Sequence, residues 1–524
     1  MPVEASLQDP PAPTPAKADE LPSLAGAKLW AAGILLGLAN FVAVLDLTIS
    51  NVSVPTIAGS LGASISQGAW VITSYAVAEA ITVPLTGWLA GRFGAARVFA
   101  AAFLAFALAS LLCGLSPSIE ILVGWRVLQG LCGAPLMPLS QALLLRLYPK
   151  RLHSAATLIW GLTTAMAPIC GPVFGGLLCD NFGWPVIFLI NVPLALGGGL
   201  AAWRILEAGR PHRAEPAPFD AIGLVLLVIW VGLLQVMLDI GKDHDWFASP
   251  LIVGLAVGSA MAFWAFLIWE LTARHPIVDL RVFRHRGFTA CMAVFVCTLA
   301  GYFAANVLTP LWLQINLGYT ATRAGLVTGA VGILVLPTAP LATWLCARFD
   351  ARAVVFTGVA WLAAAILLRG LATTDMSFWQ IYGVVLLAGA ALPMFFFPLT
   401  TLSMGAVQPH ETENASGLSG FVRTVSSAFA TSIVTTRWEK YTTIYHADLV
   451  ARSPNLQLEL EKLTRAGSSL EHARLVLDRV VQNQALVLAT NHLFWEIGAF
   501  IALGIGLIWL VPRPSRSVDP LSAH

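Results

Sequence analysis

The chain has 524 residues, of which 57% are apolar and only 11% charged, and its mean hydropathy is +0.77. An average soluble domain is less apolar and about one quarter charged, so an ordinary soluble fold is excluded. The formal net charge of +2 also argues against a nucleic-acid partner, which would require a concentrated basic surface.

Residues 1–27 are rich in proline, alanine and acidic residues, and they lack the basic and apolar regions of a secretory signal. We expect a disordered cytoplasmic tail. Beyond it, a helix that crosses the ~30 Å hydrocarbon core needs about 20 mostly apolar residues. Fourteen such runs follow, near residues 30–55, 69–90, 97–115, 121–143, 155–178, 185–203, 219–238, 251–270, 289–312, 326–346, 353–370, 379–402, 413–435 and 491–511.

A weak internal repeat divides these spans. GWLAGRFGAARVF (87–99) follows the second span and WLCARFDARAVVF (344–356) follows the tenth, which indicates two homologous bundles. We therefore predict an all-α polytopic membrane protein whose parts are a six-helix N-terminal bundle (28–205), a linker with two extra transmembrane helices (206–286), a six-helix C-terminal bundle (287–512) and a cytoplasmic tail (513–524).

The Lys and Arg residues of the short loops predict the orientation. If the N-terminus lies inside, the inner segments carry Arg92, Arg97, Lys150, Arg151, Arg204, Arg210, Arg213, Arg274, Arg281, Arg284, Arg286, Arg348, Arg352, Arg513 and Arg516. The short outer loops carry Lys242, Arg323 and Arg369. This asymmetry predicts that both termini are cytoplasmic. One long polar connection, 436–488, is then external, either as a solvated cap or as a docking surface for another protein.

Ionisable residues inside apolar spans are costly, and a functional role is their default hypothesis. Asp46, in the first span, is a candidate proton carrier whose affinity for a proton an arginine could switch; the alternative is a helix cap before Pro55. Glu79, in the middle of the second span, handles a proton or cation, or makes an interhelical hydrogen bond. Arg126 and Gln129 share one helix face in the fourth span. Arg126 keeps its charge at any accessible pH and should face Asp46 or Glu79.

The fifth span contains APICGPVFGGLL (167–178), in which prolines kink the helix and glycines allow close helix contact. This pattern suits a moving or sealing part, although generic packing uses the same residues. The further candidates for substrate binding or gating are Asn51, Gln129, Gly171, Pro172, Gly175, Gly176, Asn306 and Arg423.

Several of these segments resemble the signature motifs of the major facilitator superfamily: GWLAGRFGAARV, RVLQG, APICGPVFGGLL and FGWPVIFLINVPLALGG, in this order. The opening LDLTISNVSVPTI, the two extra central spans and Asp245, Trp246 and Phe247 resemble its fourteen-span drug:proton antiporter branch, of the multidrug export protein B type. The resemblance implies alternating access, proton coupling through Asp46 and Arg126, and an antiporter motif at Gly171, Pro172, Gly175 and Gly176. It also implies an inner loop motif at Gly87, Arg92, Gly94 and Arg97, where Gly91 replaces the usual acid.

The expected function is therefore proton-coupled export of hydrophobic or amphiphilic compounds from the inner membrane. A periplasmic membrane-fusion adaptor and an outer-membrane channel are the partners that the resemblance implies. The alternatives are a transporter of one metabolite or fatty acid, and a non-transporting membrane sensor. No cofactor is expected. An enzyme is not expected either, because the sequence shows no nucleophile–base or metal constellation, and the seven cysteines lack metal-site spacing. An ATP-driven pump is disfavoured because Asp243 follows the one Gly-Lys pair, where a P-loop needs Ser or Thr.

Overall fold

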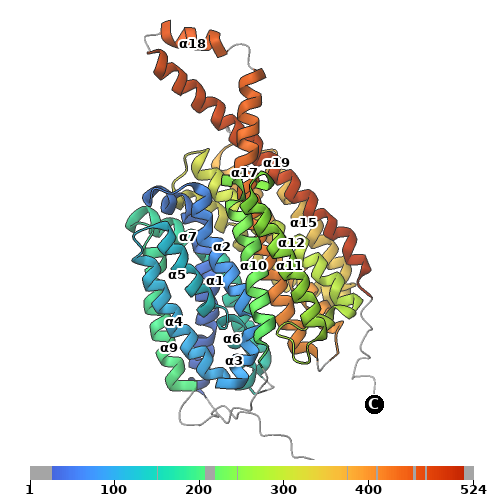
Figure 1. The fold of residues 1–524 in the computed structure, drawn as a ribbon. Helices are drawn as coiled ribbons and strands as arrows, with labels where there is room; N and C mark the ends of the chain where they lie inside the picture. Colours follow the sequence, from blue (N-terminus) through green and yellow to red (C-terminus); the bar gives the residue numbers. More distant parts are fainter. Residues whose placement is uncertain are drawn as a thin grey trace, which may run out of the picture.

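The computed structural model describes residues 26–149, 152–206, 219–244, 246–373, 376–408, 411–452, 456–465 and 469–512. Within these ranges every regular element is a helix (Figure 1). The predictions for the two terminal tails, for the start of the linker at 207–218 and for Asp245 lie outside the described residues.

The N-terminal half begins with a long helix and contains one strongly bent span, α2–α3. Its helices are α1 (Ala27–Ser60), α2 (Ile65–Thr82), α3 (Leu85–Phe93), α4 (Ala95–Gly114), α5 (Ile119–Gly133), α6 (Leu136–Leu147), α7 (His153–Phe182), α8 (Val186–Leu189) and α9 (Asn191–Leu206). Ser64 and Gln67 form a capping box that fixes the start of α2. The α2 and α3 axes differ by 56°, because Pro84 interrupts the backbone hydrogen bonds between them.

Two inserted helices follow, α10 (Ala221–Ile240) and α11 (Pro250–Thr272), joined by η2 (Gly241–His244) and η3 (Trp246–Ala248). α10 contacts α2 of the N-terminal half and α17 of the C-terminal half, whereas α11 packs mainly on α10 (Figure 1). The inserted pair therefore lies along the boundary between the two halves.

The C-terminal half ends in helices that extend well beyond the body of the protein. Its elements are η4 (Leu280–Arg284), α12 (Arg286–Ile315), α13 (Ala321–Gly329), α14 (Val331–Arg348), α15 (Ala351–Arg369), α16 (Phe378–Gly405), α17 (Thr412–Arg452), α18 (Leu456–Arg465), α19 (Leu470–Leu507) and η6 (Ile508–Leu510). Asp350 caps the first turn of α15 by accepting from the Arg352 N–H.

The number of spans is the part of the fold prediction that is not confirmed. Twelve described helices are long and apolar enough to cross a membrane, or thirteen if the bent pair α2–α3 is one span. The fourteenth predicted span, 413–435, lies in α17, which packs between α2, α12 and α19. Its many serine and threonine residues and Arg423 make it too polar for this criterion, so fourteen spans are not confirmed.

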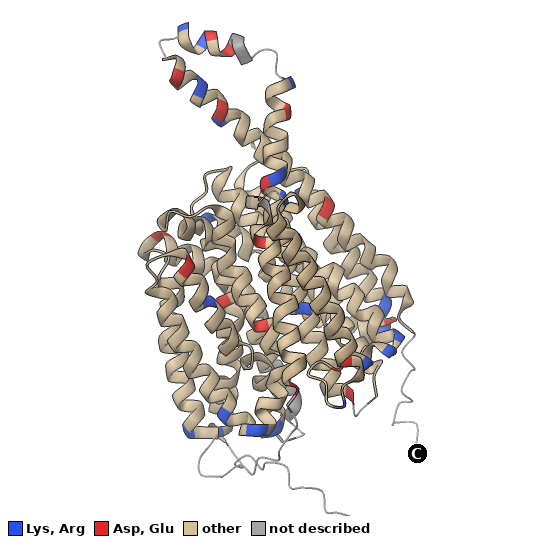
Figure 2. Ribbon diagram, viewed as in Figure 1, with Lys and Arg blue, Asp and Glu red and all other residues tan. Residues whose placement is uncertain are grey.

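The two ends of the helical body differ in charge. Lys and Arg gather where α3, α6 and α9 end, which we call the basic end (Figure 2). At the opposite end α17 and α19 continue outward as an antiparallel pair with α18 at the tip (Figure 1). At the base of this projection Trp438 donates its indole N–H to Thr490 Oγ1 at 2.8 Å. We call residues 439–489 the arm. The end of the helical body from which the arm projects, opposite the basic end, is called the arm end.

Candidate functional site

A buried carboxylate lies at the centre of the N-terminal half. Asp46 of α1 is fully buried and accepts hydrogen bonds from three side chains. Arg126 Nη1 lies 2.5 Å from Oδ2, and Oδ1 accepts from Gln129 Nε2 at 3.0 Å and from Asn191 Nδ2 at 2.8 Å. Because α1 continues as a helix through Pro55, the alternative of a helix cap at Asp46 is wrong. These donors match the ionised form of the carboxylate.

Arg126 of α5 holds the other side of this ion pair and is also fully buried. Its Nε donates to the Val71 carbonyl of α2 at 2.8 Å, and Nη1 also donates to Gln129 Oε1 at 2.7 Å. The guanidinium lies 4.2 Å from the ring centroid of Tyr75, which adds a cation–π contribution. An arginine keeps its positive charge even when it is buried, so this charge must be compensated by the Asp46 carboxylate and by the oxygen atoms and the ring just named.

A second layer of polar groups orients the ion pair. Gln129 Nε2 also donates to Ser110 Oγ of α4 at 3.1 Å, and Asn191 at the start of α9 donates to the same oxygen at 3.4 Å. α1, α2, α4, α5 and α9 thus meet in one buried polar cluster. Asn191 and Ser110 were not predicted from the sequence; for Asn191 the available signal was an amide inside the apolar run FLINVPLALGG.

Glu79 lies close to this cluster without joining it. It follows Val71 and Tyr75 at four-residue intervals on α2, so it shares the helix face that contacts Arg126. Glu79 is mostly buried, and within the described residues its Oε2 has no hydrogen-bond partner. The predicted interhelical hydrogen bond is therefore not formed at this oxygen.

The glycines of α7 bring this helix into direct contact with both halves. A Cβ on Gly171 would lie 2.1 Å from Thr48 Oγ1 of α1, and one on Gly175 would lie 2.6 Å from the Ile49 carbonyl oxygen. On the opposite face, a Cβ on Gly176 would lie 2.3 Å from the Ala321 carbonyl oxygen of α13. Such contacts require glycine, because a side chain would force the helices apart.

Two polar contacts accompany this packing at the arm end. Asp180, in the last turn of α7, accepts from the backbone N–H groups of Ala321 at 3.3 Å and Thr322 at 2.7 Å, at the start of α13. Gln314 of α12 donates to the Val52 carbonyl of α1 at 2.8 Å. Because a carboxylate stabilises the N-terminus of a helix, these contacts hold the two halves together at the arm end.

The remaining predicted residues do not reach the cluster. Asn306 donates to Tyr302 of its own helix, and Arg423 donates to Ser419 of its own helix and lies against Phe295 and Phe396. Within the described residues no acid pairs with Arg423. Asn51 is buried near the Gln314 contact, with no partner for its Oδ1 among the described residues.

The inner loop motif lies at the basic end, far along α2 and α3 from the arm end. Gly94 joins α3 to α4 with a φ of 90°, a conformation that favours glycine. Arg92 is exposed, and Gly87 lies in open space. Arg97 follows in the first turn of α4.

A half-buried acid was not among the residues predicted from the sequence. Asp239 of α10 accepts from Thr73 of α2 at 3.1 Å, from Gln235 at 2.8 Å and from Ser432 of α17 at 2.5 Å. It therefore connects the inserted helix to both halves.

Comparisons with known proteins agree with this architecture. A family profile described as the Major Facilitator Superfamily matches residues 36–431. The multidrug export protein EmrB of Escherichia coli (strain K12) is 42% identical over 94% of this chain and 97% of its own. The fatty acid resistance protein FarB of Neisseria gonorrhoeae is 36% identical over 95% of this chain and 99% of its own. Among solved structures, a bacterial homologue of the human lysosomal transporter Spinster superimposes with a TM-score of 0.62 at 14% identity, covering 95% of this chain and 100% of that one.

Proposed function

The chain belongs to the Major Facilitator Superfamily, and on that premise we propose that it is a proton-coupled antiporter that exports hydrophobic or amphiphilic compounds by alternating access. The observation that carries the coupling is the buried ion pair of Asp46 and Arg126. Its acid, Asp46, lies on α1, the helix that also packs on Gly171 and Gly175 of α7 and accepts the hydrogen bond from Gln314 at the arm end.

The coupling step follows from the geometry of α1. A proton on Asp46 removes the charge that compensates Arg126 and withdraws one acceptor from the cluster. Thr48 and Ile49, less than one turn away, pack on Gly171 and Gly175 of α7. A displacement of α1 relative to α5 would therefore also displace α7, because packed helices move as rigid elements. The contact between α7 and α13 would change with it.

Glu79 is the second group that we assign to proton handling. Its buried carboxyl oxygen has no partner in the described residues, and a charge at such a place is costly to leave uncompensated. Because it shares a helix face with Val71 and Tyr75, a change in its charge acts on Arg126.

The direction and substrate class rest on the relatives. EmrB is named as a multidrug export protein and FarB as a fatty acid resistance protein. Export of several apolar compounds is the first proposal, and export of fatty acids is the alternative that FarB supports. We assign the protein to the inner membrane with both termini in the cytoplasm, because the basic end carries the loop arginines.

The arm supports a further part of the proposal, a periplasmic adaptor that leads to an outer-membrane channel. Large apolar side chains are exposed on the arm: Ile444, Val450, Leu470, Leu475, Val476 and Val480. Exposed apolar side chains in such number on a projecting element indicate a binding partner. A helical adaptor would pack against α17 and α19 as a further helix of the same bundle.

The decisive experiment measures proton flux in proteoliposomes. When an apolar cationic dye or a fatty acid is added to vesicles with the purified protein, protons should cross the membrane in the direction opposite to the substrate. Collapsing the pH gradient should stop export. Export that continues at the same rate without any proton gradient would overturn the antiport proposal.

A further inference from the structure

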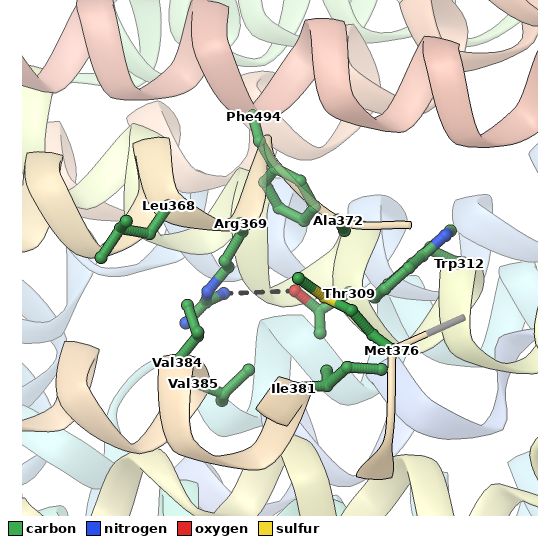
Figure 3. Close-up of a pocket in the computed structure, with 10 residues that line it drawn as sticks. All are labelled: Thr309, Trp312, Leu368, Arg369, Ala372, Met376, Ile381, Val384, Val385 and Phe494. Atoms are coloured by element: carbon green, nitrogen blue, oxygen red, sulfur yellow. Dashed lines mark hydrogen bonds between the residues drawn. The ribbon is translucent and has the colours of Figure 1, made fainter. Parts of the chain in front are cut away.

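The C-terminal half contains a small internal pocket that the proposed coupling does not use. It lies between α12, α15, α16 and α19 near the arm end, and its free volume of about 20 Å³ is room for one water-sized group (Figure 3). Its lining consists of Thr309, Trp312, Leu368, Arg369, Ala372, Met376, Ile381, Val384, Val385 and Phe494.

Arg369 is the charged group in this lining. The pattern of loop charges predicts a short outer loop for this residue, but Arg369 is the last residue of α15 and only 8% exposed. The guanidinium points into the pocket between the side chains of α16 and Thr309 (Figure 3). Nη1 donates to Thr309 Oγ1 at 3.2 Å, while Nε is buried and has no partner within the described residues.

No carboxylate of the described residues compensates this arginine. By contrast, Arg126 has Asp46 and Arg352 has Asp350. Arginine remains charged even when it is buried, and an uncompensated buried charge is strongly destabilising. Among the described residues, the pocket thus offers this arginine no counter-ion.

We propose that this pocket binds a monovalent anion at Arg369: the carboxylate head of an amphiphile, or a free halide of the same charge. A carboxylate accepts from Nε and a terminal nitrogen of one guanidinium at once. Thr309 donates its own hydroxyl to Ala305, and the Trp312 nitrogen points away from Arg369 (Figure 3). With one cation available, a divalent phosphate would remain half compensated, so a single negative charge fits best.

The pocket walls favour the amphiphile. Trp312, Ile381, Val385 and Phe494 surround the guanidinium with apolar surface, and an apolar site with one charged anchor is the usual form of a small-molecule pocket. One oxygen of the carboxylate would fill the free volume beside the guanidinium, and the rest of the amphiphile would extend beyond it. Binding at Arg369 requires no assumption about proton coupling or the direction of transport.

Thermal unfolding of the purified full-length protein in detergent tests this proposal, with decanoate, decanol and sodium chloride as separate probes at constant ionic strength. Decanoate should raise the unfolding temperature of the wild type, and decanol should not. In Arg369→Gln the apparent affinity for decanoate should fall at least about tenfold, because one charge-assisted pair is lost. Arg323→Gln, an exposed arginine at the same end, is the matched control and should respond like the wild type.

The probes separate the two sources of the anion. A chloride response that depends on Arg369 and competes with decanoate identifies a free halide as an occupant of the same site and supports the proposal. Equal responses to decanoate in the wild type and Arg369→Gln, equal responses to decanol and decanoate, or no response to any anion would overturn it. If Arg369→Gln does not fold, Val385→Asp replaces it: the new carboxylate should pair with Arg369 and abolish the response, and an undiminished response would overturn the proposal.

Discussion

Gly176 of α7 faces the carbonyl oxygen of Ala321 in α13 so closely that a Cβ on the glycine would lie 2.3 Å from that oxygen. The two helices belong to opposite halves of the protein, and Asp180 accepts from the first N–H groups of α13 one turn away. The contact at the arm end thus depends on the absence of a side chain at one position.

We predict that Gly176→Ala opens the arm end. The added methyl group meets the backbone of Ala321 and Thr322 in α13. Overpacking of this kind costs about 1–3 kcal/mol, which shifts a two-state equilibrium about 5-fold to 150-fold. Cysteine labelling of the α7–α13 contact in vesicles would measure the change. Gly161→Ala on the same helix, where no atom lies within 4 Å of the new Cβ, is the control, and equal labelling of the two variants would contradict the prediction.

The Asp46–Arg126 pair gives a second prediction. Asp46→Asn leaves Arg126 buried without its counter-ion, which should cost about 3–5 kcal/mol of stability and abolish substrate-driven proton flux in proteoliposomes. Arg126→Ala should abolish the flux as well. Asp448→Asn, on the exposed surface of the arm, serves as the matched control.

A double variant distinguishes loss of coupling from loss of folding. Asp46→Asn combined with Arg126→Gln removes both charges, so it should recover part of the thermal stability that the single Asp46 variant loses. Proton flux should remain absent. Normal flux in any of these variants would refute the role assigned to the pair.

Glu79→Gln should change the pH dependence of export. Gln keeps the shape of the side chain but carries no titratable proton, so the rate should respond less to external pH if Glu79 loads a proton during the cycle. Initial rates between pH 5 and 8 in proteoliposomes would measure this. Glu120→Gln, at the exposed start of α5, is the control; a Glu79 variant with the wild-type profile would count against the assignment.

The arm gives a prediction about assembly. Leu475 and Val480 of α19 are 62% and 54% exposed, and an aspartate at either position would place a charge in the centre of an apolar contact. Leu475→Asp and Val480→Asp should therefore reduce recovery of a co-expressed adaptor in a pull-down. Transport by the isolated protein in proteoliposomes should be unchanged. Undiminished recovery of the adaptor would show that the adaptor does not bind at these positions of the arm.

Only some residues of the buried polar cluster can be predicted from the sequence. Asp46, Arg126 and Gln129 are recognisable because charged and polar groups inside apolar spans are rare, and the structure brings them together. Asn191 and Ser110 complete the same cluster but give a weaker signal, since single amides and hydroxyls are common in apolar helices. Arg369 was misplaced because the pattern of loop charges does not tell whether a side chain at a helix end turns outward or inward.

The sequence by itself determines that the chain is helical and membrane-spanning, because the apolar runs leave no other means of satisfying the backbone in lipid. Its motifs also indicate the superfamily and the residues around Asp46. Only the tertiary structure decides that Arg126 pairs with Asp46 and not with Glu79, that α7 touches both halves, and that Arg369 lies in a pocket with no carboxylate of the described residues beside it. The physical reason is that hydropathy fixes the length of each helix in the membrane, whereas its rotation and neighbours depend on packing between residues far apart in the sequence.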